Sequence, residues 1–342
     1  MKVKLKKLQE QTIVITGASS GIGLATARQA ARRGARVVLN ARNEEALNNI
    51  VADIVSAGGT AFYVVGDVGR FDDVERIGDE TLRRYGGFDT WISNAGVSIY
   101  GPVLKQALED QRRLFETNYW GMVHGSMVAC QHLRKRGGAL INIGSVLSDR
   151  AIPLQGTYCA SKHAIKGYTD ALRMELEKDD IPISVTLIKP SAVDTPYVRH
   201  AKNLLSTEPL NPPPVYAPDL VAEAILHCAE HPERDVIVGG GGMALSAISP
   251  HLPQLTDKFM RATMFDLQKS GEPKPDDRAD SLHFPIQDGE ERGVYPGHVA
   301  KSSLYTQTSL HPFVVGSVIA GTGFAIAQWW KSRSRRGRDE SS

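Results

Sequence analysis

Tyr158 and Lys162 are the pair of residues whose types and spacing most clearly suggest chemistry. Four residues apart on a helix, they would share one face. A phenol with a pKa of about 10 is a poor base at neutral pH, and a neighbouring ammonium favours its ionised form. The pair therefore predicts a general acid–base whose pKa is lowered by a cation. Taken alone, the same spacing also fits two unrelated residues of an ordinary helix.

A glycine-rich turn stands near the start of the chain, where residues 16–23 read TGASSGIG directly after an apolar run. Glycines let the backbone turn sharply and approach a pyrophosphate, whose charge is met by amide groups at the start of the next helix. An ordinary tight turn is the alternative. The position between an expected strand and an expected helix favours a dinucleotide site.

The end of the second expected strand indicates which dinucleotide is bound. An acidic residue there would bind the ribose hydroxyls of NAD, whereas a basic residue nearby would neutralise the 2′-phosphate of NADP. This sequence reads VVLNAR there, so Ala41 and not an acid stands at the end of the strand, and Arg42 follows it. We therefore expect NADP(H). The alternative is that Arg42 is a solvated residue at the entry of the following helix.

These motifs resemble the short-chain dehydrogenase/reductase family over residues 8–245. The turn is similar to the family's TGxxxGxG fingerprint, and YCASK at 158–162 is similar to its YxxxK pair. Residues 93–96 (SNAG) resemble NNAG with Ser93 in place of Asn, and residues 190–195 (PSAVDT) resemble PGxVxT with Ser191 in place of Gly. Ser145 ends an INIGS segment thirteen residues before Tyr158, and Asn118 lies in ETNYWG, both as in the family.

The resemblance implies an oxidoreductase that moves hydride between NADP(H) and a carbonyl or alcohol, without a metal. Tyr158 would exchange the proton, and Ser145 would hydrogen-bond the substrate oxygen. The implied catalytic residues are Asn118, Ser145, Tyr158 and Lys162. The implied cofactor contacts are Thr16, Gly17, Ser19, Ser20, Gly21, Ile22, Gly23, Arg42, Asp67, Val68, Asn94, Ala95, Gly96, Tyr158, Lys162, Pro190, Val193 and Thr195. The family also implies a homo-oligomer formed through the helices that carry Asn118 and Tyr158.

Seven short apolar runs must position these residues. They lie at 12–16, 36–40, 61–65, 90–93, 139–143, 183–188 and 235–238, and amphipathic stretches long enough for helices separate them. Strands that alternate with helices predict an α/β protein with a doubly wound parallel sheet, a Rossmann fold. We expect residues 1–250 to form one NADP-binding catalytic domain. Residues 251–312, rich in Pro, Asp, Gly and Ser, are expected to form an irregular extension or linker.

The positions that face substrate in the family are mostly apolar here: Val97, Ser98, Ile99, Val146, Leu147, Ile152 and Tyr197. They predict a lipophilic ketone, aldehyde or alcohol, although apolar residues are also what a core contains. The net charge of +2 argues against nucleic acid as a partner. The three cysteines have neither metal-ligand spacing nor a disulfide pattern.

The C-terminal region suggests a membrane contact. Residues 313–330 form an apolar segment that ends in two tryptophans, and the basic tail 331–342 follows. The segment is predicted to be a membrane helix or an interfacial anchor. The alternative is a helix packed against the domain or in an oligomer contact. We expect the catalytic domain in the cytoplasm, because residues 1–10 lack the apolar stretch of a secretory signal.

Two other classes of function compete with an active reductase. One is a catalytically silent NADP-binding scaffold or sensor that keeps the fold. The other is a membrane-docked interaction protein whose essential part is the tail.

Overall fold

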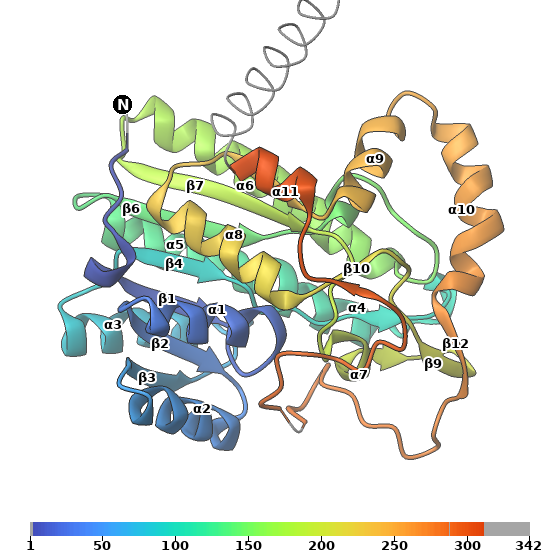
Figure 1. Cartoon of the computed structure of the whole chain (residues 1–342), viewed down its shortest axis with the longest axis horizontal. Coiled ribbons are helices and arrows are strands. Elements are labelled where there is room, and N and C mark those ends of the chain that lie inside the picture. Colours follow the sequence, from blue (N-terminus) through green and yellow to red (C-terminus); the bar gives the residue numbers. More distant parts are fainter. Residues whose placement is uncertain (1–2, 287, 311–342) are drawn as a thin grey trace, which may run out of the picture.

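The computed structural model of the chain describes residues 3–286 and 288–310, and a seven-stranded sheet forms its centre (Figure 1). The strand order is β11-β7-β6-β4-β1-β2-β3, and all neighbours pair in parallel. The strands are β1 Thr12–Thr16, β2 Arg36–Ala41, β3 Thr60–Val65, β4 Thr90–Ser93, β6 Gly138–Ile143, β7 Ile183–Pro190 and β11 Asp235–Val238. The predicted doubly wound parallel sheet is confirmed, and each of the seven apolar runs is one of its strands.

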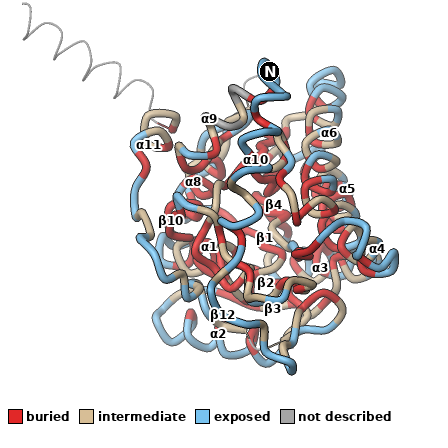
Figure 2. The backbone as a smooth tube through the Cα atoms, turned by 90° about the vertical axis from the view of Figure 1, so that its right-hand side faces the viewer, coloured by how far each residue is buried: buried red, intermediate tan, exposed pale blue. Residues whose placement is uncertain are grey.

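Helices cover both faces of the sheet because the strand residues alternate between two apolar cores. The main helices are α1 Gly21–Arg32, α2 Glu44–Ser56, α3 Phe71–Tyr85, α4 Leu108–Phe115, α5 Gly121–Leu133, α6 Gly156–Lys178 and α8 Pro218–Glu230. Ile13 and Ile15 of β1 belong to the core that includes α1, α2 and α8. Val14 between them belongs to the core that includes α3, α5 and α6. Figure 2 shows the sheet buried between these two layers.

The order of the strands places a crevice beside β1. The strand order reverses at β1: β2 and β3 lie on one side of it, and β4 and the later strands of the sheet lie on the other. Ligands of open α/β sheets bind at such a reversal, outside the carboxyl ends of the strands. The glycine turn follows β1, Arg42 follows β2, Asn94 follows β4 and Ser145 follows β6. Parallel pairing therefore brings these four segments to one edge.

The chain beyond β11 is folded onto this domain. Its elements are α9 Gly240–Ile248, α10 Pro253–Leu267, β12 Lys269–Pro273, β13 Val299–Ala300 and α11 Leu304–Leu310. β12 pairs with β9 (Thr207–Pro209), and β13 pairs with β10 (Val215–Tyr216). Figure 1 shows this region, in orange and red, running along the edge where the parallel strands end. The sequence pattern did not predict α10. Three further short elements, β5 Ile99–Tyr100, α7 Tyr197–His200 and β8 Lys202–Asn203, lie in the loops at this edge.

The membrane segment predicted at 313–330 lies outside the described residues. Within residues 3–286 and 288–310, none of the helices has both the length and the apolar character that crossing a membrane requires.

Gly23 gives a test of how tightly the first turn packs. An added Cβ would lie 2.1 Å from the carbonyl oxygen of Gly17 and 2.6 Å from Nδ2 of Asn94, both fixed by the turn. We expect Gly23→Ala to lower the free energy of unfolding by at least about 2 kcal/mol, because neither neighbour can move freely. Urea unfolding followed by circular dichroism measures this. Gly167→Ala is the control, since Gly167 lies within α6 with open space around it.

The control should change the free energy of unfolding by less than about 1 kcal/mol, in the stabilising direction expected from helix propensity. Equal stability of Gly23→Ala and the unsubstituted chain would contradict the packing described for the turn.

Candidate active site

A cavity of about 530 Å³ opens at the carboxyl ends of the parallel strands. This volume is in the range of ligand sites. It extends from the glycine turn and Arg42 at one end to Ser145 and Tyr158 at the other. A single site can therefore hold a dinucleotide and a reacting group in contact with each other.

Most of the residues predicted from the sequence line this cavity. They are Gly17, Ser19, Ser20, Gly21, Ile22, Arg42, Asp67, Val68, Asn94, Ala95, Gly96, Ser145, Tyr158, Lys162, Pro190, Val193 and Thr195. Thr16, Gly23 and Asn118 lie behind the lining. Gly23 packs against Gly17 and Asn94, and the contacts of Thr16 and Asn118 are described below.

The glycine turn is held against the turn that follows β4. Thr16 Oγ1 accepts hydrogen bonds from the backbone N–H of Asn94 (3.0 Å) and Ala95 (3.3 Å). The side chain of Asn94 donates to the carbonyls of Thr16 and Gly17 at 3.0 and 2.9 Å. Gly17 has φ +62°, and an added Cβ there would lie 2.7 Å from Ala95 Cα. Thr16, Gly17 and Asn94 thus fix the cradle, whose amide groups and small residues suit a pyrophosphate.

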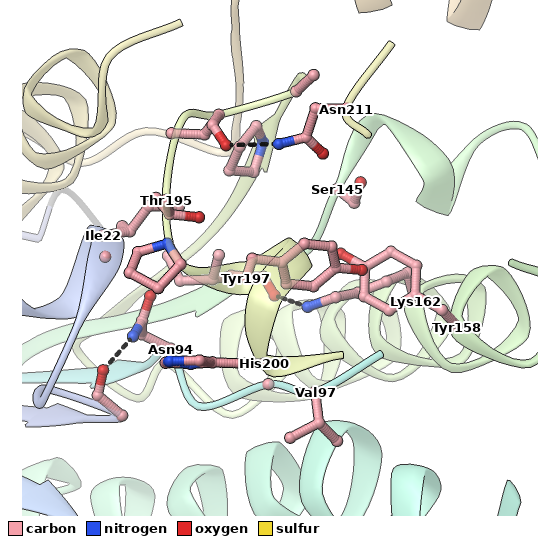
Figure 3. A pocket seen from close by; sticks show the side chains of 18 of the residues that line it. Ile22, Asn94, Val97, Ser145, Tyr158, Lys162, Thr195, Tyr197, His200 and Asn211 are labelled. Carbon is pink, nitrogen blue, oxygen red and sulfur yellow. Dashed lines mark hydrogen bonds between the residues drawn. The ribbon is translucent and has the colours of Figure 1, made fainter. Parts of the chain in front are cut away.

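Tyr158 and Lys162 lie one turn apart on α6, on the same side of the cavity as Ser145 (Figure 3). Lys162 Nζ is 5.6 Å from the centre of the Tyr158 ring. Ser145 Oγ accepts a hydrogen bond from the N–H of Leu147 at 3.0 Å, so its proton stays available to another acceptor. The structure therefore brings the predicted phenol, ammonium and hydroxyl together.

The pKa of Tyr158 differs from the sequence-based expectation. We expected Lys162 to lower it, but burial dominates and raises the pKa to about 12, against smaller opposing hydrogen bonds from Tyr197 and Ser145. The physical reason is that removal from water destabilises the phenolate. At neutral pH the phenol is therefore protonated and suited to donate a proton.

Lys162 is also buried, with 4% of its surface exposed. Its Nζ donates to the carbonyl oxygen of Ile143 at 2.8 Å. Burial lowers the pKa of its ammonium to about 8. Tyr158 and Lys162 are thus both shifted towards their neutral forms, a pattern typical of functional sites.

Asn118 lies in a π-helical turn, Glu116–Trp120, between α4 and α5. Such turns are frequent at functional sites. The Asn118 side chain accepts from the N–H of Val97 at 2.8 Å and donates to the Val97 carbonyl and to Ser161 Oγ. A Cβ at Gly96 would lie 3.5 Å from Asn118 Oδ1 and 4.0 Å from Lys162 Nζ. Glycine at this position therefore keeps the space between the two polar groups open.

Tyr197 is a polar member of the site that the sequence analysis placed among the apolar substrate positions. Its ring packs edge-to-face on Tyr158 with the centres 5.6 Å apart, and its hydroxyl donates to Gln155 Oε1 at 3.3 Å. Burial raises its pKa well above the usual value. Because its ring packs against that of Tyr158, Tyr197 limits where the phenol can lie. Only the fold reveals this, since the two residues lie on different elements.

After β7 the sequence differs from the family pattern, because Ser191 stands in place of a glycine. Ser191 Oγ donates to the carbonyl of Gly239 at 3.1 Å, so the added hydroxyl has a partner. Pro190, Val193 and Thr195 line the cavity as predicted from the sequence.

The substrate end of the cavity is apolar. Val97, Val146, Leu147 and Ile152 line it, whereas Ser98 and Ile99 are buried away from it. The extension adds a wall that the sequence analysis missed, formed by Phe259, Met260, Met264 and Leu267 from α10 or its end.

The nucleotide end is also covered by the extension. The Arg42 guanidinium donates to the backbone carbonyls of Ser281, Leu282 and His283. Asp67, one of the cofactor contacts that the family resemblance implies, accepts from Arg113 at 2.6 Å and from the N–H of Gly69 at 2.9 Å. Ser281, Pro285, Ile286 and Asp288 line the cavity from this side.

A phosphate cradle and a partly buried acid–base tyrosine at the reversal point of a parallel sheet define a nucleotide-dependent oxidoreductase. The family model for short chain dehydrogenase matches residues 11–204. The chain belongs to the short-chain dehydrogenase/reductase family.

Three similar proteins place the chain within that family. An uncharacterized oxidoreductase, YxnA of Bacillus subtilis, is 44% identical over 323 residues, covering 94% of this chain and 91% of its own length. That match therefore reaches well into the extension. A 3beta-hydroxysteroid dehydrogenase of Eggerthella lenta is 35% identical over 192 residues, covering 55% of this chain and 73% of its own. A solved alcohol dehydrogenase from Thermococcus sibiricus, complexed with 5-hydroxy-NADP, has a TM-score of 0.59 and 26% identity, covering 67% and 95% of the two chains.

The buried Lys162 predicts an unusual pH dependence of stability. Its pKa is about 8 in the folded chain and 10.5 when unperturbed. Between these values the unfolded chain binds more protons, so the free energy of unfolding rises with pH, by roughly 3 kcal/mol at most. Below pH 8 the full penalty of burying the charge remains. Urea unfolding of the unsubstituted chain and of Lys162→Met at pH 7 and pH 10 measures the difference.

Lys162→Met should be the more stable of the two at pH 7, and its advantage should shrink at pH 10. Parallel pH profiles of the two proteins would contradict the shifted pKa.

Proposed function

We propose that the chain transfers hydride between NADP(H) and a carbonyl or alcohol group of a lipophilic small molecule. The observation that carries this proposal is the placement of Tyr158 and Ser145 in the same cavity as the glycine cradle. An acid–base group beside a dinucleotide site is the arrangement that carbonyl reduction needs.

The chain's own residues have separable tasks in this proposal. Tyr158, protonated at neutral pH, donates its proton to the substrate oxygen in the reducing direction and accepts it in the oxidising direction. Ser145 donates a hydrogen bond to the same oxygen and stabilises the charge that develops there. Lys162 supplies positive charge near the phenol when it is protonated, and Asn118 holds the loop of Val97. The nicotinamide, when bound, supplies or accepts the hydride.

Arg42 and the absence of an acid at Ala41 support NADP(H) as the preferred nucleotide. The guanidinium of Arg42 lines the nucleotide end of the cavity, where a 2′-phosphate would need a cation. Ser19, on the adjoining turn, provides a hydroxyl donor at the same end. A nucleotide-bound relative of known structure, the alcohol dehydrogenase described above, carries an NADP derivative.

The apolar lining supports a lipophilic substrate. Side chains from α10 and from the loops after β4 and β6 form walls without a clustered cation that could hold a carboxylate or phosphate. A steroid, as in the name of the Eggerthella relative, has the corresponding chemistry. Two further expectations stay predictions: a homo-oligomer formed through the helical segments that carry Asn118 and Tyr158, and a membrane contact through residues 313–330.

Replacement of Tyr158 tests the proposed reaction. We expect Tyr158→Phe to lower NADPH-dependent reduction of lipophilic ketones and aldehydes at least about 100-fold, because the proton donor is removed. NADPH binding should persist. Tyr168→Phe, which removes a hydroxyl from the same helix, is the matched control and should keep its turnover. The readout is NADPH oxidation across a substrate panel, together with nucleotide binding by fluorescence. Equal turnover of the Tyr158→Phe and unsubstituted proteins would refute the proposed acid–base role.

Replacement of Arg42 tests the nucleotide preference. We expect Arg42→Ala to raise the Kd for NADPH about tenfold or more and to change the Kd for NADH little, because only NADPH has a 2′-phosphate. Arg33→Ala, which removes an exposed arginine near the end of α1, controls for net charge. Equal weakening of both nucleotides by Arg42→Ala would contradict the proposed preference.

A further inference from the structure

A segment of the extension crosses the nucleotide end of the cavity. We call residues 281–286 and 288–291 the strap. Ser281, Pro285, Ile286 and Asp288 of the strap line the cavity together with the glycine turn and the end of β2. The strap is more than two hundred residues from these segments in the sequence, so only the fold brings them together.

The strap accepts hydrogen bonds from the donors that would face a nucleotide. The N–H of Gly21, at the start of α1, donates to the carbonyl of Glu290 at 2.9 Å. Arg42 donates to three strap carbonyls, and the side chain of Asn43 donates to the carbonyl of Ile286 at 3.0 Å. The strap thus places carbonyl oxygens against the N-terminus of α1 and against the guanidinium of Arg42. Both groups favour anions.

Asp288 brings a negative charge to this place. One carboxylate oxygen of Asp288 accepts from Ser19 Oγ at 2.7 Å, and the other lies 3.4 Å from Nε2 of His200. The N–H of Gly289 donates to the Ser19 carbonyl at 3.0 Å, and this second hydrogen bond holds the strap against the glycine turn. Burial lowers the pKa of the Arg42 guanidinium, and the negative charge of Asp288 is one of the influences that oppose this lowering. Asp288 therefore engages both Ser19 and Arg42.

Ion pairs and hydrogen bonds anchor the chain on both sides of the strap. On one side, Arg278 pairs with Glu208 at 2.9 Å and donates to carbonyls of the α7 segment. At the other end, Glu291, the last residue of the strap, pairs with Arg28 at 2.8 Å, and Arg292 just beyond it pairs with Asp219 at 2.7 Å. The position of Asp288 is thus held by the surrounding contacts.

We propose that Asp288, carried by the extension, is a specificity-determining residue that opposes a 2′-phosphate at Ser19 and Arg42. The inference rests on the proposed function, since it deepens the account of the same nucleotide site. A phosphate monoester carries close to two negative charges at neutral pH. In this partly buried setting its repulsion from the carboxylate is weakly screened. A nucleotide with a 2′-phosphate must displace Asp288, whereas one with a 2′-hydroxyl can leave it in place. Asp288 therefore reduces, without reversing, the preference for NADP(H) that Arg42 and Ser19 provide.

Binding of two adenosine fragments tests this proposal without any turnover. The probes are 2′,5′-ADP, which carries the 2′-phosphate, and 5′-AMP, which lacks it. We expect Asp288→Asn in the full chain to tighten 2′,5′-ADP about tenfold and to change 5′-AMP less than about twofold, because only one probe is repelled by the carboxylate. Asp276→Asn is the matched control, since Asp276 is an exposed acid of the same extension. Isothermal titration calorimetry gives the affinities.

Hydrogen exchange supplies a second readout. The backbone amides of the strap, including that of Gly289, should exchange faster with 2′,5′-ADP bound than with 5′-AMP bound. Equal changes in affinity for both probes, or strap amides that are protected by 2′,5′-ADP, would overturn the proposal. Binding of neither probe would overturn it together with the proposed cofactor. Selective tightening of 2′,5′-ADP in a protein that reduces no carbonyl would support the role of Asp288 and count against the proposed reaction alone.

Discussion

Parallel pairing of the strands is the constraint on which the site depends. Because β1, β2, β4, β6 and β7 all run the same way, the segments that follow them meet at one edge of the sheet. The glycine turn, Arg42, Asn94, Ser145 and Pro190 come from five places in the sequence, and each lies at or just after the end of one of these strands. The buried cores on both faces hold the strands in register, so the positions of these groups are set by packing far from the cavity.

Within the cavity, burial has more influence than charge. It raises the pKa of Tyr158 to about 12 and lowers that of Lys162 to about 8, although the two groups are neighbours on one helix. A protonated phenol is what a proton donor requires, whereas a base would need the opposite shift. A positive charge that stabilises the phenolate of Tyr158 must therefore outweigh desolvation. The nearby hydroxyls of Ser145 and Tyr197 act against the rise in the pKa of Tyr158 through hydrogen bonding.

The sequence could predict what local patterns encode. The apolar runs predicted all seven strands of the central sheet, because a strand buried on both faces is largely apolar. The glycine turn, Ser145, Tyr158 and Lys162 were predicted because short motifs specify them, and the structure gathers them at one cavity. The pKa of Tyr158 was not predictable, since spacing gives neighbours but not burial. The strap and α10 were also missed, because their positions depend on contacts such as Asp288 to Ser19 across 269 residues. No local pattern reports such contacts.

The most direct test of the account is isotope transfer. The full chain would be incubated with a lipophilic ketone and NADPH deuterated at the transferring position of nicotinamide C4, and the product analysed by mass spectrometry. The account predicts an alcohol with one deuterium on the carbinol carbon, formed at least about 100-fold more slowly when Tyr158 is replaced by Phe. Tight NADPH binding without deuterium in the product from any carbonyl compound tested would contradict it and indicate a nucleotide-binding protein without reductase activity.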